Sequence, residues 1–184
     1  MDIKKDIRSR ILQKRQALTE EERTCFSDMI LQKVISHPWY QMADTIYCYA
    51  SFSSEVSTNQ IISHAWKSGK RVALPKVVGS RKMEFYYIQG FEDLNYGFRG
   101  ILEPSTSQRA FAEHGLMLMP GAVFDPYCGR IGYGGGFYDA YLGEHTSINT
   151  IALAFQVQIV EHIPMEEHDI RPQIVMTEKE SYSC

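Results

Sequence analysis

Apolar positions follow a helical spacing in the first part of the chain. Isoleucines recur at every fourth position between charged residues, which predicts an amphipathic helix from about Ile3 to Leu18. Thr19 and Glu22 have the spacing of a capping box and predict the start of a second helix. This helix should end near Ser36, because Pro38 disfavours helical geometry at the residue before it.

Short β-rich runs separated by turn residues follow from Thr45 onward. A helical pattern over Thr58–Lys67, closed by Gly69, lies between the first two runs, and this order of strand, helix and strand is typical of parallel sheets. Pro75 is expected to end the second strand. The expected strands cover residues 45–49, 71–74, 83–88, 116–119, 150–155 and 174–177.

This alternation runs along the whole chain without a Pro- or Ser-rich linker, a repeat or a low-complexity tract. It predicts an α/β fold, a single three-layer domain over residues 1–184 with a mostly parallel sheet. Ligands of such sheets bind at the carboxyl ends of the strands. The candidate site is therefore expected there.

Composition narrows the class of protein further. The 184 residues carry 19 Lys and Arg against 22 Asp and Glu, and the net charge of -3 argues against general affinity for nucleic acid or anionic membranes. The N-terminal residues lack the apolar core of a signal peptide, and the longest apolar stretch, 115–124, is half a membrane span. The four cysteines, without a C-x-x-C pair, favour reduced thiols and a cytoplasmic location; they are Cys25, Cys48, Cys128 and Cys184.

A glycine-rich segment is the strongest candidate for chemistry. Five of the thirteen glycines lie between Gly129 and Gly136, and apolar residues at helical spacing follow over Phe137–Leu142. Backbone N–H groups of such a loop, before a helix N-terminus, form a concave anion site, to which Arg130 adds a cation. A flexible surface turn is the more usual reading of a glycine cluster. Interleaved aromatic residues and the carboxylate of Asp139 weigh against that reading here.

Standard nucleotide-binding fingerprints do not match this segment. A G-x-G-x-x-G pattern that starts at Gly132 fails at Phe137, and G-x-x-x-x-G-K-[ST] occurs nowhere. What the segment does resemble is the signature of the 5-formyltetrahydrofolate cyclo-ligase (methenyltetrahydrofolate synthetase) family. The resemblance covers PGAVFDPYCGRIGYGGGFYDAYL at 120–142, Lys-x-x-x-Arg at 4–8, the strand and Ser-Glu at 45–55, LPKV at 74–77, Glu103-Pro104 and His168-Asp169.

The resemblance implies a fold shared with sugar-phosphate isomerases and CoA transferases, and a reaction that depends on ATP and Mg²⁺. That reaction converts 5-formyltetrahydrofolate, with or without a polyglutamate tail, into 5,10-methenyltetrahydrofolate, ADP and phosphate. Phosphorylation of the formyl oxygen makes the unreactive amide open to attack by N10, so positioning and charge neutralisation matter more than a protein nucleophile. Two positions depart from the family pattern: many members carry lysine at Gly135 and arginine at Ala140.

The resemblance also implies roles for individual residues. The catalytic candidates are Arg130 and Tyr138, and the metal candidates are Asp139 and Asp169. The ATP-binding candidates are Lys4, Lys5, Asp6, Ile7, Arg8, Arg130, Ile131, Gly132, Tyr133, Gly134, Gly135, Gly136, Phe137 and Tyr138. The substrate-binding candidates are Arg8, Ala50, Glu55, Tyr133, Gly134, Gly135, Gly136 and Phe137. Lys76 is a further candidate phosphate cation, and His168 is a candidate to position Asp169.

Simpler interpretations stay open for several of these residues. Asp139 has the position of a carboxylate in the first turn of a helix, which the helix dipole favours. Glu55 could cap the following helix. Lys4 and Arg8 could lie on a solvated helix face. Two other functions also stay open, a folate- or nucleotide-binding module without turnover and a sugar-phosphate isomerase of the same fold class. A monomer is expected, without nucleic-acid or membrane partners.

Overall fold

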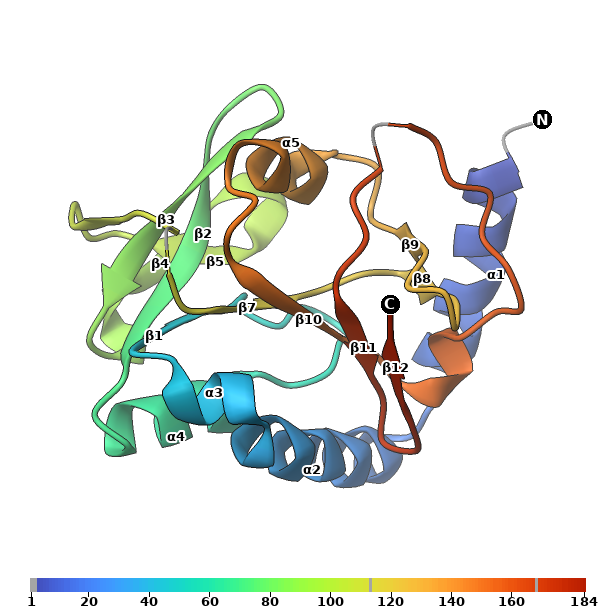
Figure 1. Ribbon diagram of the computed structural model, residues 1–184, viewed down its shortest axis with the longest axis horizontal. Coiled ribbons are helices and arrows are strands. Elements are labelled where there is room, and N and C mark those ends of the chain that lie inside the picture. The colour runs from blue at the N-terminus through green and yellow to red at the C-terminus, as the bar shows by residue number, and fades with distance from the viewer. Residues whose placement is uncertain (1–2, 113, 168) are drawn as a thin grey trace.

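A large mixed sheet forms the centre of the computed structural model, which describes residues 3–112, 114–167 and 169–184 (Figure 1). Its strands are β1 (Thr45–Tyr47), β2 (Arg71–Gly79), β3 (Lys82–Ile88), β6 (Arg109–Ala110), β7 (Leu116–Met119), β10 (Asn149–Leu153), β11 (Ile174–Met176) and β12 (Ser181–Ser183). They lie in the order β12-β11-β10-β7-β1-β2-β3-β6. Two small ribbons stand apart, β4 (Leu94–Tyr96) with β5 (Leu102–Pro104) and β8 (Val123–Phe124) with β9 (Arg130–Ile131).

The interior of the sheet is parallel and its two margins are antiparallel. β1 pairs in parallel with both β2 and β7, and β10 pairs in parallel with β7 and β11. β12 on one side, and β3 and β6 on the other, are antiparallel to their neighbours. The predicted α/β fold with a mostly parallel sheet is confirmed. Its relation to sugar-phosphate isomerases and CoA transferases stays a prediction.

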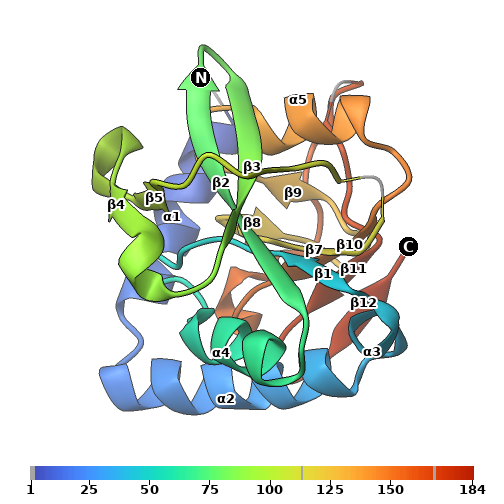
Figure 2. The ribbon, with the colours of Figure 1, turned by 90° about the vertical axis from the view of Figure 1, so that its left-hand side faces the viewer.

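Helices cover both faces of the sheet, as Figures 1 and 2 show. The helices are α1 (Ile3–Gln16), α2 (Glu20–Ser36), α3 (Pro38–Met42), α4 (Asn59–Lys67) and α5 (Phe137–Glu144), with short 3-10 turns η1 (Phe91–Asp93), η2 (Phe98–Gly100) and η3 (Gln156–Gln158). α2, α3 and α4 pack on one face through a hydrophobic core, and α5 packs on the other through Tyr141 and Leu142. α1 packs beside the β8–β9 ribbon through Ile7 and Ile11.

The start of α2 confirms the predicted capping box. The hydroxyl of Thr19 accepts the N–H of Glu22 at 3.1 Å, and the Glu22 carboxylate accepts the N–H of Thr19 at 2.8 Å. These bonds satisfy donors that the first turn of a helix leaves unpaired. α2 ends at Ser36, as expected from Pro38.

The prediction that Pro75 ends its strand was wrong, because β2 continues to Gly79. β1 ends beside Ala73, whose carbonyl accepts the N–H of Cys48 at 2.9 Å. In a strand, the backbone groups of every second residue face the same side, so the nitrogen of Pro75 faces the same side of β2 as the carbonyl of Ala73. β1 has already ended at Pro75, so no N–H donor is needed there. The strand therefore extends with β3 as a long hairpin whose tip lies beside α5 in both views (Figures 1 and 2).

The expectation of four reduced thiols was also wrong. The structure joins Cys128 and Cys184 in a disulfide, with Cα atoms 6.1 Å apart and a sequence separation of 56. Folding brings the β8–β9 turn next to β12, and the spacing of cysteines in the sequence does not reveal that proximity. Cys25 and Cys48 remain thiols. In the described part of the chain, no helix is long and apolar enough to cross a membrane.

Candidate active site

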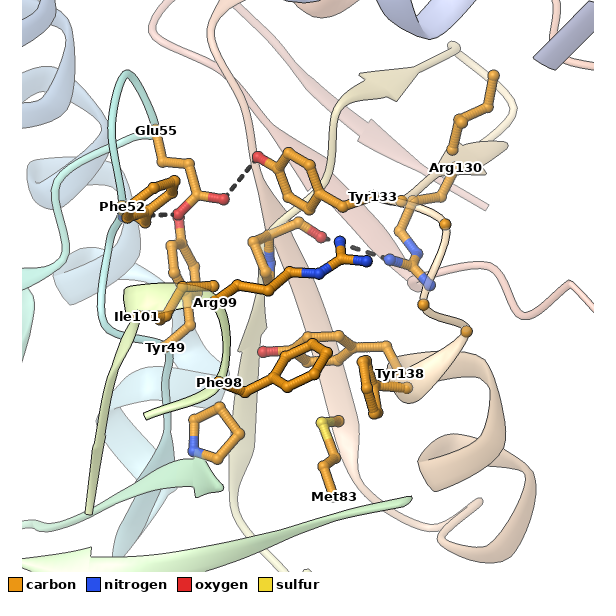
Figure 3. A pocket seen from close by; sticks show the side chains of 18 of the residues that line it. Tyr49, Phe52, Glu55, Met83, Phe98, Arg99, Ile101, Arg130, Tyr133 and Tyr138 are labelled. Atoms are coloured by element: carbon orange, nitrogen blue, oxygen red, sulfur yellow. Dashed lines mark hydrogen bonds between the residues drawn. The ribbon is translucent and has the colours of Figure 1, made fainter. Parts of the chain in front are cut away.

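A cavity of about 860 Å³ opens at the carboxyl ends of β1, β2 and β7, where the sequence predicted ligands to bind. Tyr49 and Ala50 follow β1, Pro75 and Val77 lie in the distal half of β2, and Pro120 follows β7. Its volume falls in the range of about 300–1,000 Å³ that is usual for small-molecule sites. Figure 3 shows how side chains from these separate segments face one another across the cavity.

Most of the predicted site residues line this cavity. They are Lys4, Arg8, Ala50, Glu55, Arg130, Ile131, Gly132, Tyr133, Gly134, Gly135, Gly136, Phe137, Tyr138, Asp139 and Asp169. Lys5, Asp6 and Ile7 do not, because α1 turns them away while Lys4 and Arg8 share its cavity side. Lys76 also lies outside the lining, with its ammonium 5.7 Å from the centre of the Tyr86 ring. His168 lies outside the described residues.

Gly132–Gly136, called the glycine loop below, leads into the N-terminus of α5. Gly134 and Gly136 have φ of +90° and +64°, a region that residues with a Cβ rarely adopt. Gly136 is the N-cap of α5. A Cβ at Gly135 would lie 2.6 Å from the ring of Phe137, so this position is closed by packing. The loop therefore presents bare backbone to the cavity, as an anion site requires.

Arg130 and Asp139 form an ion pair beside the glycine loop. Their side chains are 3.0 Å apart, and the Arg130 side chain is only 4% exposed. The Nε of Arg130 and the hydroxyl of Tyr138 are buried without a hydrogen-bond partner in the described part of the chain. The Tyr138 ring lies beneath the Arg130 guanidinium, and its hydroxyl points into the cavity (Figure 3). Buried polar groups are normally paired, so both atoms point to a ligand.

Lys4 and two carboxylates form a second charged group at this end. The ammonium of Lys4 lies 2.5 Å from Asp169 and 3.2 Å from Glu166. Burial lowers the pKa of Lys4, but hydrogen bonds and charges from both carboxylates outweigh it and raise the pKa overall. Asp139 accepts the N–H of Ile170 at 3.1 Å, which places Asp139 beside the segment that carries Asp169.

These two aspartates fit the requirements of Mg²⁺, although they do not form a complete metal cage. No cluster of three or more His, Cys, Asp or Glu ligands occurs among the described residues. Mg²⁺ does not need one, since proteins usually hold it by one or two carboxylates together with substrate phosphates and water. Asp139 and Asp169 both line the cavity next to the glycine loop. The donor set therefore suits a metal that arrives with a phosphorylated ligand.

The opposite end of the cavity is built around Glu55. Its carboxylate accepts the hydroxyl of Tyr133 at 2.5 Å and the N–H of Phe52 at 2.8 Å (Figure 3). The buried guanidinium of Arg15 donates to the same Tyr133 oxygen at 2.7 Å and to Ser54 at 3.1 Å. Burial raises the pKa of Glu55, although the bonds from Tyr133 and Phe52 and the charge of Arg15 oppose it.

The sequence reasoning missed several lining residues. Arg15 continues the helix face of Lys4 and Arg8, so its spacing could have revealed it. Arg81, in the turn between β2 and β3, and Arg99, in η2, carry no such signal. Arg99 extends across the cavity in Figure 3, and its neighbour Phe98 meets Phe137 edge to face with ring centroids 5.7 Å apart. The β4–β5 hairpin thus covers part of the glycine loop.

Comparisons with known proteins by sequence and by structure agree on one family. The sequence profile of the 5-formyltetrahydrofolate cyclo-ligase family matches residues 1–178. The chain is 33% identical to a 5-formyltetrahydrofolate cyclo-ligase of Mus musculus, over 95% of this chain and 93% of that protein. It is 31% identical to one of Escherichia coli K12, over 91% and 96%. The solved structure of a 5,10-methenyltetrahydrofolate synthetase from Aquifex aeolicus is similar with a TM-score of 0.88 and 28% identity, over 98% of this chain and 92% of that one.

Proposed function

Because the chain belongs to the 5-formyltetrahydrofolate cyclo-ligase family, we propose that its cavity binds 5-formyltetrahydrofolate and ATP together and joins N5 and N10 through the formyl carbon. The products are 5,10-methenyltetrahydrofolate, ADP and phosphate. The observation that carries the proposal is the division of one cavity into a cationic glycine-loop end and an end built around a half-buried carboxylate.

The glycine-loop end suits the polyphosphate of ATP. Lys4, Arg8 and Arg130 line it, and the bare backbone of the loop precedes the positive end of α5. Arginine is well matched to phosphate oxygens because its planar guanidinium donates two parallel hydrogen bonds. Mg²⁺ held by Asp139 and Asp169 would neutralise phosphate charge at the same place.

The Glu55 end suits the pterin ring of the folate. A carboxylate can accept two hydrogen bonds from neighbouring N–H donors of such a ring. Ala50 leaves room at the end of β1, and Tyr133 and Phe137 offer ring faces and edges from the loop. Tyr133 of the loop reaches Glu55 at this end, so the loop connects the two ends and can hold the formyl group and the terminal phosphate close together.

The proposed reaction starts with transfer of the γ-phosphoryl group of ATP to the formyl oxygen. N10 then attacks the formyl carbon and loses its proton, and the carbon–oxygen bond breaks as phosphate leaves. The chain's own groups act by placing donors where negative charge develops. Arg130 and Tyr138 are assigned this role, because the Nε of Arg130 and the hydroxyl of Tyr138 are buried without partners in the described chain.

The test is a direct assay of purified protein with 5-formyltetrahydrofolate and ATP, with and without Mg²⁺. We expect the ultraviolet absorbance of the methenyl product to rise only when ATP is present, and to rise faster with Mg²⁺. Folded protein that yields no ATP-dependent product would refute the proposal. Calorimetric binding of both ligands without product would favour the binding module instead.

Three further properties belong to the proposal. We expect a monomer, a cytoplasmic location and acceptance of polyglutamylated folates. Size-exclusion chromatography with light scattering tests the first, and fractionation of the source cells tests the second. Kinetics with one and with several glutamates on the substrate test the third.

A further inference from the structure

Three arginines from three separate elements lie against alternate glycines of the glycine loop. A Cβ built on Gly132 would lie 3.2 Å from the nearest guanidinium nitrogen of Arg130. The same distance is 3.7 Å from Gly134 to Arg8 and 2.9 Å from Gly136 to Arg81. β9 carries Arg130, α1 carries Arg8 and the β2–β3 turn carries Arg81. The glycines thus let three cations approach one stretch of backbone.

The charges of these arginines are balanced to different degrees. Arg130 pairs with Asp139 at 3.0 Å. Arg8 donates to the carbonyl of Gly132 at 3.4 Å, and no carboxylate pairs with it in the described part of the chain. Arg81 has neither an ion pair nor a side-chain hydrogen bond to any described residue, although it lines the cavity.

Arg81 is exposed at the tip of the hairpin and adds uncompensated positive charge to the lining of the cavity. Its guanidinium lies against Gly136, the N-cap of α5, where the helix carries partial positive charge. Arg8 adds a second uncompensated cation two residues away along the loop. The unpartnered Nε of the buried Arg130 is an independent sign that this wall holds a ligand. An anion with several oxygens would satisfy all of these groups at once.

We infer that Arg81 binds the polyphosphate of the nucleotide and closes the glycine loop on the side opposite α1. This inference rests on the proposed function, since it places a further residue in the same nucleotide site. The extension of β2 past Pro75 makes it possible, because the long hairpin carries the turn residue Arg81 to the loop. The other anion in the proposed reaction is the glutamate tail of the folate. Phosphate is the better match, because Arg81 lies against Gly136, the N-cap of α5, and a helix N-terminus together with a guanidinium favours phosphate oxygens.

The experiment compares Arg81→Gln and Arg81→Lys with Lys82→Gln, which removes one charge from the next residue of the same hairpin. Lys82 is a suitable control because it is largely exposed, faces Glu84 at 3.7 Å and does not line the cavity. Binding of a non-hydrolysable ATP analogue and of inorganic tripolyphosphate is measured by calorimetry, and KM values are measured for ATP and for folate.

For Arg81→Gln we expect the Kd of both phosphate probes to rise about tenfold or more, the effect of losing one charge-assisted contact. Arg81→Lys should fall between wild type and Arg81→Gln, because it keeps the charge and loses the planar donor pair. Lys82→Gln should change Kd by less than about twofold, as an exposed charge does. The KM for folate should stay unchanged in all three variants.

Other outcomes overturn the inference. Equal Kd values for wild type and Arg81→Gln would remove Arg81 from the nucleotide site. A rise in the folate KM alone would assign Arg81 to the glutamate tail instead. Because the probes need no turnover, a protein that binds them through Arg81 but forms no methenyl product would refute the proposed function and leave this inference standing.

Discussion

The glycine-loop end and the Glu55 end of the cavity are both polar, but they balance charge in different ways. At the glycine-loop end, Arg130 and Lys4 pair with carboxylates while Arg8 and Arg81 have no carboxylate partner among the described residues. At the other end, Glu55 is engaged by neutral donors, with the cation of Arg15 acting through the Tyr133 hydroxyl. The first end is left positive for an anionic ligand. The second holds one carboxylate in a defined direction, and the proposed function assigns it to the pterin ring.

The largest expected effect comes from removing the charge of Asp139. Asp139→Asn keeps an acceptor for the N–H of Ile170 but loses the ion pair with Arg130 and the metal ligand. We expect kcat to fall by about a hundredfold or more, the scale of losing an electrostatic group at the reacting centre. Stopped assays over a range of Mg²⁺ concentrations measure the loss, and circular dichroism checks that the variant is folded.

Asp28→Asn is the matched control for that change. Asp28 is exposed on α2, outside the cavity lining, and accepts a hydrogen bond from Gln60 that asparagine can also accept. It should leave kcat and the Mg²⁺ dependence unchanged. If Asp139→Asn retained wild-type turnover, the assignment of charge neutralisation to this end would fail.

A smaller effect, restricted to the folate, is expected at the other end. Glu55→Gln replaces one acceptor oxygen by an amide donor, so the side chain can no longer accept both of the bonds now made by Tyr133 and Phe52. We expect the folate KM to rise about ten- to a hundredfold, equivalent to about 1.4–2.7 kcal/mol, while the ATP KM stays the same. Steady-state kinetics with each substrate varied in turn separates the two.

Glu161→Gln, an exposed carboxylate outside the cavity lining, is the control for Glu55→Gln. Parallel changes in both KM values of the Glu55 variant would show that the two ends do not act separately. The proposal that the two ends bind different ligands would then be wrong.

The pH dependence of folate binding sharpens the same comparison. Burial raises the pKa of Glu55 above its ordinary 4.5, so the carboxylate takes up a proton at a higher pH than an exposed glutamate. Folate affinity should weaken by up to about tenfold per pH unit below the folded-state pKa. Titration of folate Kd against pH measures this step, which should be absent in Glu55→Gln.

The raised pKa of Glu55 affects the stability of the fold with the opposite sign to its effect on folate affinity. A carboxyl whose pKa is raised in the folded state contributes stability that is fully present below pH 4.5 and is lost as pH rises through the folded-state pKa. Glu55 itself therefore does not cause unfolding while folate affinity falls. A loss of folate affinity that coincided with unfolding, followed by circular dichroism, would contradict the prediction.

The smallest effect is expected far from both ends. Thr19→Ala removes the side-chain acceptor of the capping box at the start of α2. We expect the free energy of unfolding to fall by about 1 kcal/mol, with kcat and both KM values unchanged. Urea denaturation and the standard assay check both parts, and a change in either KM would show that α2 is coupled to the cavity.

Local patterns explain why much of the molecule could be predicted. The capping box at Thr19 and the glycine loop depend on residues within a few positions of each other, so their geometry is readable from spacing. The resemblance placed Arg8, Glu55 and Asp139 at the site, and all three line the cavity. The catalytic, binding and metal roles assigned to these residues stay predictions until the variants are measured.

The missed features depend on contacts between distant segments. Pro75 predicts a strand end because a proline lacks a ladder donor, but β1 stops earlier and leaves that side of β2 without a neighbour. Arg81 reaches Gly136 through this longer hairpin. The disulfide between Cys128 and Cys184 likewise joins segments that meet only in the folded sheet.

By itself the sequence determined the class of fold, the position of the glycine loop before a helix and the family, since helical period, turn chemistry and a contiguous signature are all local in the chain. Only the tertiary structure decided which cations face the loop and which of them lack a counter-charge. Charge balance depends on distances between groups from α1, β9 and the β2–β3 turn. Such distances exist only once the sheet has set the three elements around one cavity.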